Sequence, residues 1–198
     1  MGEPIEERIR RVLAERDLRP LTTEGMRVSA VLMPLFVRDE RLHVLLTKRS
    51  NDVENHKGQI SFPGGTRDAG DESLLATALR ETWEEIGLPA GEVRVLGRLD
   101  DHATLTNFRI TPFVGVIPHP FAFQVSDVEI ERLIEVPIDS FLDNPTFEVH
   151  YAGLTDRRYV VYSYEYLGDI IWGATARIIT QFLHLVYGFD APHVDEPE

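Results

Sequence analysis

The chain has 198 residues, of which 43% are hydrophobic and 27% charged, a balance typical of one soluble globular domain with its own core. It contains no cysteine, which excludes disulfides, thiolate metal sites and a cysteine nucleophile. A net charge of −13 argues against nucleic acid and anionic membranes as partners. A phosphate-bearing substrate would therefore need a local positive group, a bound metal ion, or both.

Hydrophobic periodicity and turn residues predict an α+β domain with layered helices and strands. In chain order, the sequence first predicts a helix over 4–16, then strands over 27–37 and 41–48 joined by a turn at 38–40, and then a glycine-bearing loop over 55–70. A helix over 71–86 follows, with strands over 92–99 and 110–117 after it. The remainder is an ambiguous segment over 127–142 with a short helix after Pro137, a hairpin of 147–150 with 158–165, and a last helix over 174–187. Gly87 and Gly188 stand where glycines commonly end helices.

No segment has the apolar run of a signal peptide or of a membrane-spanning helix, and the C-terminal residues match no retention or peroxisomal signal. We therefore expect a cytoplasmic protein.

Acidic residues gather on one side of the predicted helix over 71–86. At about 100° per residue, Glu81, Glu84 and Glu85 lie within one sector and their side chains converge. Like charges at these spacings oppose one another by roughly 0.2–0.5 kcal/mol per pair, and the helix dipole disfavours anions in the last turns. A divalent cation would remove both conflicts, with Arg80 holding one carboxylate in place. The other interpretation is a solvated, charged helix end.

The stretch over 64–88 resembles the Nudix box, in which Gly, five residues, Glu and seven residues precede Arg-Glu-U-x-Glu-Glu-x-Gly-U, where U is bulky and apolar. Residues 73–79 supply the seven-residue spacer after Glu72. The spacer between Gly65 and Glu72 is one residue longer than the pattern, and Thr82 occupies the first U position. The matching positions are Arg80, Glu81, Glu84, Glu85, Gly87 and Leu88.

Two flanking segments are similar to the coenzyme A diphosphatase branch of this family. Residues 45–50 and 56–65 resemble its signature motif, which often has Arg at the position of Glu54. Residues 171–179 resemble its Trp-Gly-x-Thr-Ala element at the start of the last helix. The candidate substrate-binding residues in the first segment are Lys48, Arg49, Lys57, Gly58 and Gln59. The alternatives are that Lys48 and Arg49 only end an exposed strand and that Trp172 serves packing.

The resemblance implies an α/β/α sandwich around a mixed sheet over 24–190, with the box as a loop-helix-loop. Residues 1–23 would be a helical extension and 191–198 an acidic tail. It implies Mg²⁺ or Mn²⁺ on Glu81, Glu84, Glu85 and the Gly65 carbonyl, with Arg80 orienting the carboxylates. The general base would be Glu81 or the downstream Glu129, which is equally readable as a surface charge.

The expected reaction is hydrolysis of coenzyme A to 4′-phosphopantetheine and adenosine 3′,5′-bisphosphate. Three alternatives stay open: another nucleotide substrate such as ADP-ribose, NADH, a dinucleotide polyphosphate or a damaged nucleoside triphosphate; a catalytically silent Nudix-fold binding module; and an acidic structural protein. Many members of the family form homodimers, and the sequence leaves the oligomeric state open.

Overall fold

The computed structural model describes residues 3–18, 21, 24–50, 57–142, 147–154 and 157–191, with the backbone alone for 150–154 and 157–159. Glu54 and residues 192–198 of the predicted acidic tail lie outside the described residues. In the part of the chain that the structure describes, no helix is long and apolar enough to cross a membrane.

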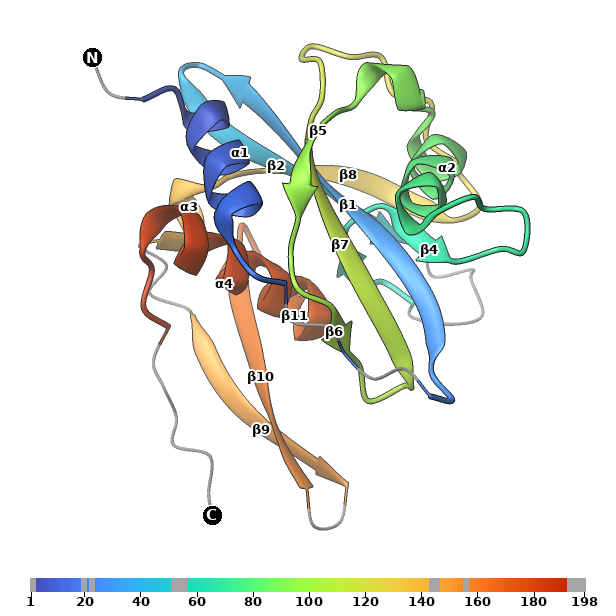
Figure 1. The fold of residues 1–198 in the computed structure, drawn as a ribbon, viewed down its shortest axis with the longest axis vertical. Coiled ribbons are helices and arrows are strands. Elements are labelled where there is room, and N and C mark those ends of the chain that lie inside the picture. The colour runs from blue at the N-terminus through green and yellow to red at the C-terminus, as the bar shows by residue number, and fades with distance from the viewer. Residues whose placement is uncertain are drawn as a thin grey trace.

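A mixed sheet forms the centre of the fold (Figure 1). Its long strands are β1 (Arg27–Arg38), β2 (Arg41–Arg49), β5 (Arg94–Arg98), β7 (Phe108–Val116) and β8 (Ile130–Pro137). The main path is β3-β2-β1-β7-β5, in which β3 is the short strand Ile60–Ser61. Three further strands pair outside this path: β4 (Gly64–Thr66) with β1, β6 (His102–Ala103) with β7, and β8 with β2. β1 and β7 are parallel, whereas β1–β2 and β2–β8 are antiparallel.

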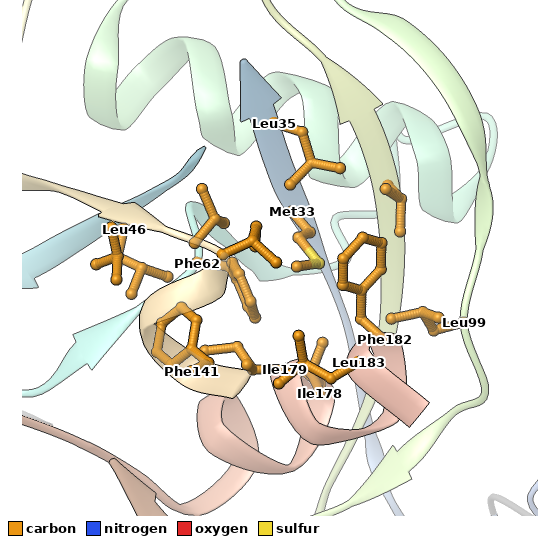
Figure 2. Close-up of a cluster of buried hydrophobic side chains, with 14 of the residues drawn as sticks. Met33, Leu35, Leu46, Phe62, Leu99, Phe141, Ile178, Ile179, Phe182 and Leu183 are labelled. Atoms are coloured by element: carbon orange, nitrogen blue, oxygen red, sulfur yellow. The ribbon is translucent and has the colours of Figure 1, made fainter. Parts of the chain in front are cut away.

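Helices cover both faces of this sheet. Because successive strand residues point to opposite faces, Met33 and Leu35 of β1 join one core cluster and Phe36 joins the other. The larger cluster includes residues of α1 (Ile5–Glu15) and α4 (Gly173–Tyr187), and part of it is shown in Figure 2. The smaller cluster contains Ile86 at the end of α2 (Leu74–Ile86) and Leu88. The predicted α+β, layered fold is confirmed.

A second, antiparallel sheet of β9 (Glu148–Leu154), β10 (Arg157–Tyr166) and β11 (Asp169–Trp172) extends from the main body (Figure 1). It is attached to α4, since the buried Tyr164 hydroxyl of β10 lies 2.8 Å from the Thr180 hydroxyl. This contact holds the end of β10 against the middle of α4.

Several short elements differ from the sequence-based expectation. The predicted loop over 55–70 contains β3 (Ile60–Ser61) and β4 (Gly64–Thr66), and β6 (His102–Ala103) and the 3-10 helix Ala90–Glu92 were not predicted. The ambiguous segment contains β8 and the expected short helix, α3 (Asp139–Leu142). α2 begins three residues late because the Ser73 side chain caps it, accepting a hydrogen bond from the Ala76 N–H at 3.1 Å.

Helix α1 packs into the main core through Ile9, which is fully buried. We expect Ile9→Ala to lower the free energy of unfolding by about 2–5 kcal/mol, since it removes buried methyl groups and leaves a cavity. Arg10→Ala, an exposed change on the same helix, is the matched control and should alter stability by less than about 0.5 kcal/mol. Chemical denaturation measures both, and equal stabilities for the two variants would contradict the packing of α1.

Candidate active site

Strand β4 lies between β1 and α2, and its two glycines, Gly64 and Gly65, occupy positions with no room for a side chain. It pairs antiparallel with β1, with Gly65 opposite Ala30 and Gly64 opposite Val31. A Cβ atom at Gly64 would overlap the backbone of β1, and one at Gly65 would overlap the Glu81 carboxyl group. These glycines therefore allow the backbone of β4 to approach the carboxylates of α2.

Glu85 is a buried carboxyl group, with 3% of the residue exposed. Its Oε2 accepts a hydrogen bond from the Gly64 N–H at 3.2 Å, and its Oε1 lies 3.5 Å from Arg49 Nη1. Burial raises the pKa of Glu85 to about 8, because these two contacts only partly offset the lost hydration and the charges of Glu81 and Glu129 raise it further. A carboxyl group with so little compensating charge is typical of a functional site.

Glu81 lies one helical turn earlier on α2 and is partly buried. Burial raises its pKa, Arg80 lowers it, and the charges of Glu84 and Glu129 raise it. Glu81 and Glu85 line the same cavity, but Glu84 does not. Its side chain is 46% exposed, and Glu84 Oε2 accepts a hydrogen bond from Arg80 Nη1 at 2.9 Å.

Glu84 therefore does not face the cavity with Glu81 and Glu85, and its role as a metal ligand stays a prediction. Within the described residues, no group of three or more His, Cys, Asp or Glu side chains is arranged to hold a metal ion. Arg80 Nη1 lies 2.9 Å from both Glu81 Oε1 and Glu84 Oε2, so these two carboxylates converge on one guanidinium nitrogen.

Arg80 is held by an aspartate that the sequence analysis did not single out. Its Nε and Nη2 donate to the two oxygens of Asp71 at 2.9 and 3.1 Å, while its Nη1 lies 2.9 Å from Glu81 Oε1. The Arg80 guanidinium, followed by the Asp68 N–H, holds the pKa of the Asp71 carboxyl well below its usual range. Arg80 therefore links the loop before α2 to the Glu81 carboxylate.

The Nudix-box alignment above assigned the loop acid to Glu72, which is exposed. Asp71 follows Gly65 with five residues in between, as the pattern requires, and this spacing was the available sequence signal.

A cavity of about 630 Å³ opens beside the two carboxylates. Six of the predicted site residues line it, namely Gly65, Glu81, Glu85, Glu129, Arg49 and Gln59. Glu129 is exposed and lies beside the end of β2, because its carbonyl accepts a hydrogen bond at 2.8 Å from the N–H of Ser50, the residue after that strand. The cavity therefore collects residues from four separate stretches of the sequence.

Lys48, Lys57 and Gly58 do not line the cavity, so the predicted basic group is divided. Adjacent strand residues point to opposite sides, and Lys48 Nζ lies 3.5 Å from Glu131 Oε1 and 3.7 Å from Asp169 Oδ1. Arg49 is the predicted cation that reaches the cavity. Its Nε is buried and has no hydrogen-bond partner among the described residues.

The other cavity residues come from places that sequence reasoning treated as packing or did not consider. Trp172 and Arg177 belong to the segment over 171–179 that resembles the Trp-Gly-x-Thr-Ala element. His102 belongs to the unpredicted strand β6, and Leu105 to the loop after it. The lining of this part is His102, Ala103, Thr104, Leu105, Thr106, Val160, Val161, Trp172, Gly173, Ala174, Thr175 and Arg177. No local pattern marks these residues, because tertiary folding alone brings them together.

The donor atoms at the carboxylate end fit a hard divalent cation. Glu81 and Glu85 offer carboxylate oxygens beside the backbone of Gly65, and oxygen ligands of this kind suit Mg²⁺ or Mn²⁺. Burial raises the pKa of both carboxyl groups, so a nearby positive charge would stabilise their ionised forms.

Comparison with known proteins places this site in a family. A family model described as "NUDIX domain" matches residues 26–144. The "Uncharacterized Nudix hydrolase NudL" of Yersinia pestis (strain Pestoides F) is 38% identical over 156 residues, which cover 77% of this chain and 76% of that protein. The same values hold for the protein of that name from Yersinia pseudotuberculosis serotype O:1b (strain IP 31758).

Among solved structures, the NUDIX hydrolase from Alicyclobacillus acidocaldarius is similar with a TM-score of 0.55 and 18% identity. The match covers 82% of this chain and 92% of that chain, and it shows a shared fold. The match of the family model over more than half of the chain, together with the Yersinia relatives, shows that the chain belongs to the NUDIX domain family.

Proposed function

We propose that this chain is a divalent-metal-dependent pyrophosphohydrolase that cleaves the diphosphate of coenzyme A or its thioesters to 4′-phosphopantetheine and adenosine 3′,5′-bisphosphate. The observation that carries the chemistry is the pair of carboxylates formed by the buried Glu85 and the partly buried Glu81, which face one cavity beside Gly65. Family membership supports a hydrolase. The choice of coenzyme A rests on the resemblance of the segments over 45–65 and 171–179 to the coenzyme A diphosphatases.

Glu81, Glu85 and the Gly65 carbonyl would hold Mg²⁺ or Mn²⁺ at the carboxylate end of the cavity. The bound ion would neutralise the diphosphate and lower the pKa of a coordinated water. Arg49 is the cation that would contact the diphosphate, since its buried Nε has no hydrogen-bond partner in the described residues.

Arg80 would position the Glu81 carboxylate, because it binds both that group and Asp71. Glu84 would act through Arg80 rather than in the cavity.

Glu129 is the preferred candidate for the general base. It lines the cavity, its charge acts on both Glu81 and Glu85, and its side chain makes no ion pair with the described residues. Glu81 is the alternative, but its Oε1 already contacts Arg80 Nη1 at 2.9 Å, which favours a ligand role. In either case the glutamate carboxylate would accept a proton from the attacking water. The rest of the protein's contribution would be positioning and charge, on which phosphoryl transfer mainly depends.

Incubation of the purified protein with coenzyme A and Mg²⁺ or Mn²⁺ should release adenosine 3′,5′-bisphosphate. We expect kcat/KM for coenzyme A to exceed that for ADP-ribose and NADH by about 10-fold or more, the size of effect that a few additional substrate contacts provide. Chromatographic analysis of products measures this directly. Preference for another substrate would refute the coenzyme A assignment, and cleavage of none would favour the silent binding module.

Glu85→Gln should remove most turnover, by about 100-fold or more, yet stabilise the metal-free protein at alkaline pH. Since burial raises the pKa of Glu85 from 4.5 to about 8, the folded protein retains a proton that the unfolded chain releases. The free energy of unfolding therefore falls as pH rises from about 4.5 to about 8. In chelator at pH 9, we expect Glu85→Gln to raise Tm by at least about 2–4 °C.

Melting curves from pH 5 to 9 test this for the wild-type protein, Glu85→Gln and the exposed control Glu84→Gln. As pH rises, the wild-type protein should lose stability more steeply than Glu85→Gln. The pH profile of Glu84→Gln should match that of the wild-type protein. Parallel pH profiles for the wild-type protein and Glu85→Gln would show that Glu85 does not titrate in this window.

Asp71→Asn should lower kcat/KM about 10–100-fold on the best substrate with the fold intact, because Arg80 loses the partner that fixes its approach to Glu81. Glu72→Gln is the matched control and should change kcat/KM by less than about 2-fold, since Glu72 is exposed and outside this network. The structure-based assignment is wrong if Glu72→Gln proves the more damaging change.

A further inference from the structure

The proposed chemistry leaves one part of the cavity unused. It is formed by Trp172, the first turns of α4 as far as Arg177, and Val160 and Val161 of β10. His102 of the short strand β6 contacts Gln181 of α4 and lines the same cavity. The cavity thus extends from the carboxylates of α2 to a separate wall that carries a positive charge.

Arg177 is the unpaired cation of this cavity. Its side chain is exposed at the cavity lining, and it makes no hydrogen bond or ion pair with any described residue. Arg49, the other arginine that lines the cavity, lies 3.5 Å from Glu85. In a chain of net charge −13, a cavity arginine without a carboxylate partner is a binding position for an anion from solution.

The acidic residues near Arg177 have other partners. Asp100 pairs with Arg16 at 2.5 Å, and Asp101 pairs with Arg98 at 2.7 Å. These interactions leave the Arg177 guanidinium available to a ligand.

His102 brings no competing charge to this wall. Burial, followed by the positive charge of Arg177, lowers the pKa of His102 to about 4, so the imidazole is neutral near pH 7. Its Nε2 lies 3.2 Å from Gln181 Oε1, one turn after Arg177 on α4. His102 therefore leaves Arg177 as the positive charge among the residues that form this wall.

The two arginines act at different places in the cavity. Arg49 Nη1 lies 3.5 Å from Glu85 Oε1, whereas Arg177 lies one helical turn before Gln181, whose side chain contacts His102 of β6. An anion bound by Arg177 would therefore differ from the diphosphate held at the carboxylate end. A volume of about 630 Å³ is large enough for a nucleotide that carries charged groups at both places.

We propose that Arg177 binds an anionic group of the substrate outside the scissile diphosphate, a further phosphate carried by the same nucleotide. This inference rests on the proposed function, which assigns the scissile diphosphate to Glu81, Glu85 and Arg49. Arg177 selects nucleotides that carry the extra phosphate, because its fork of N–H donors matches phosphate oxygens. It is a specificity residue and takes no part in bond cleavage.

Calorimetric binding of two ligands that differ by one phosphate tests this without turnover. In buffer containing Mg²⁺, the wild-type protein should bind adenosine 3′,5′-bisphosphate about 10-fold or more tightly than 5′-AMP. Arg177→Ala should lose most of that preference, and Arg177→Lys should retain part of it. Arg10→Ala removes one exposed positive charge outside the cavity and should keep the wild-type preference.

Hydrolysis of coenzyme A and of dephospho-coenzyme A gives the second comparison. We expect Arg177→Ala to lower kcat/KM about 10-fold for coenzyme A, mainly through KM, and to affect dephospho-coenzyme A far less. Equal losses on both substrates, or an undiminished preference for the bisphosphate in Arg177→Ala, would overturn the inference. If the wild-type protein cleaves neither compound but its bisphosphate preference depends on Arg177, the proposed function fails and the inference stands.

Discussion

Glu85 carries a carboxyl group into the protein interior, where the Gly64 N–H and the Arg49 guanidinium offset its burial only in part. The surrounding structure is built to hold it there. Ile86 and Leu88 fix the end of α2 in the smaller core cluster, and Gly87 ends the helix in a left-handed conformation with φ of 69°. A buried carboxyl group is costly unless a proton, a hydrogen bond or a cation compensates it. The fold thus maintains a position at which a cation is favourable.

The neighbouring charges divide the acidic helix into two parts. Arg80 binds Asp71 and Glu84 at the surface and touches Glu81, whereas Glu81 and Glu85 remain at the cavity. The chain as a whole carries a net charge of −13. Its arginines are placed individually at the cavity rather than gathered into one basic patch, and this matches a small anionic ligand better than a nucleic acid.

Local sequence patterns predicted the parts of this molecule that depend on nearby residues. Helical spacing predicted α2, and the glycine after it predicted where it ends, because both depend on a single turn of backbone. The placement of Glu81 and Glu85 on one side of α2 followed from the same geometry. Spacing did not show that the Glu84 carboxylate would lie outside the cavity lining in contact with Arg80, because that depends on side-chain partners rather than on helix geometry.

Features that depend on distant residues were not predictable in this way. Lys48 points away from the cavity because strand alternation separates it from Arg49, and strands β3 and β4 are too short to show a periodic pattern. Arg177 was interpreted as part of a packing segment. Its role as a cavity cation became visible only when β6, β10 and α4 were seen to meet.

The central claim, that Glu81 and Glu85 form a metal site, is most directly tested by calorimetric titration of the protein with Mn²⁺ at pH 7 in buffers of different ionisation enthalpy. Because burial raises the pKa of Glu85 to about 8, binding at this site must displace a proton. We expect saturable binding with proton release in the wild-type protein, and loss of both in the Glu81→Gln, Glu85→Gln double variant. Unchanged Mn²⁺ binding in the double variant, or binding without proton release, would contradict the assignment.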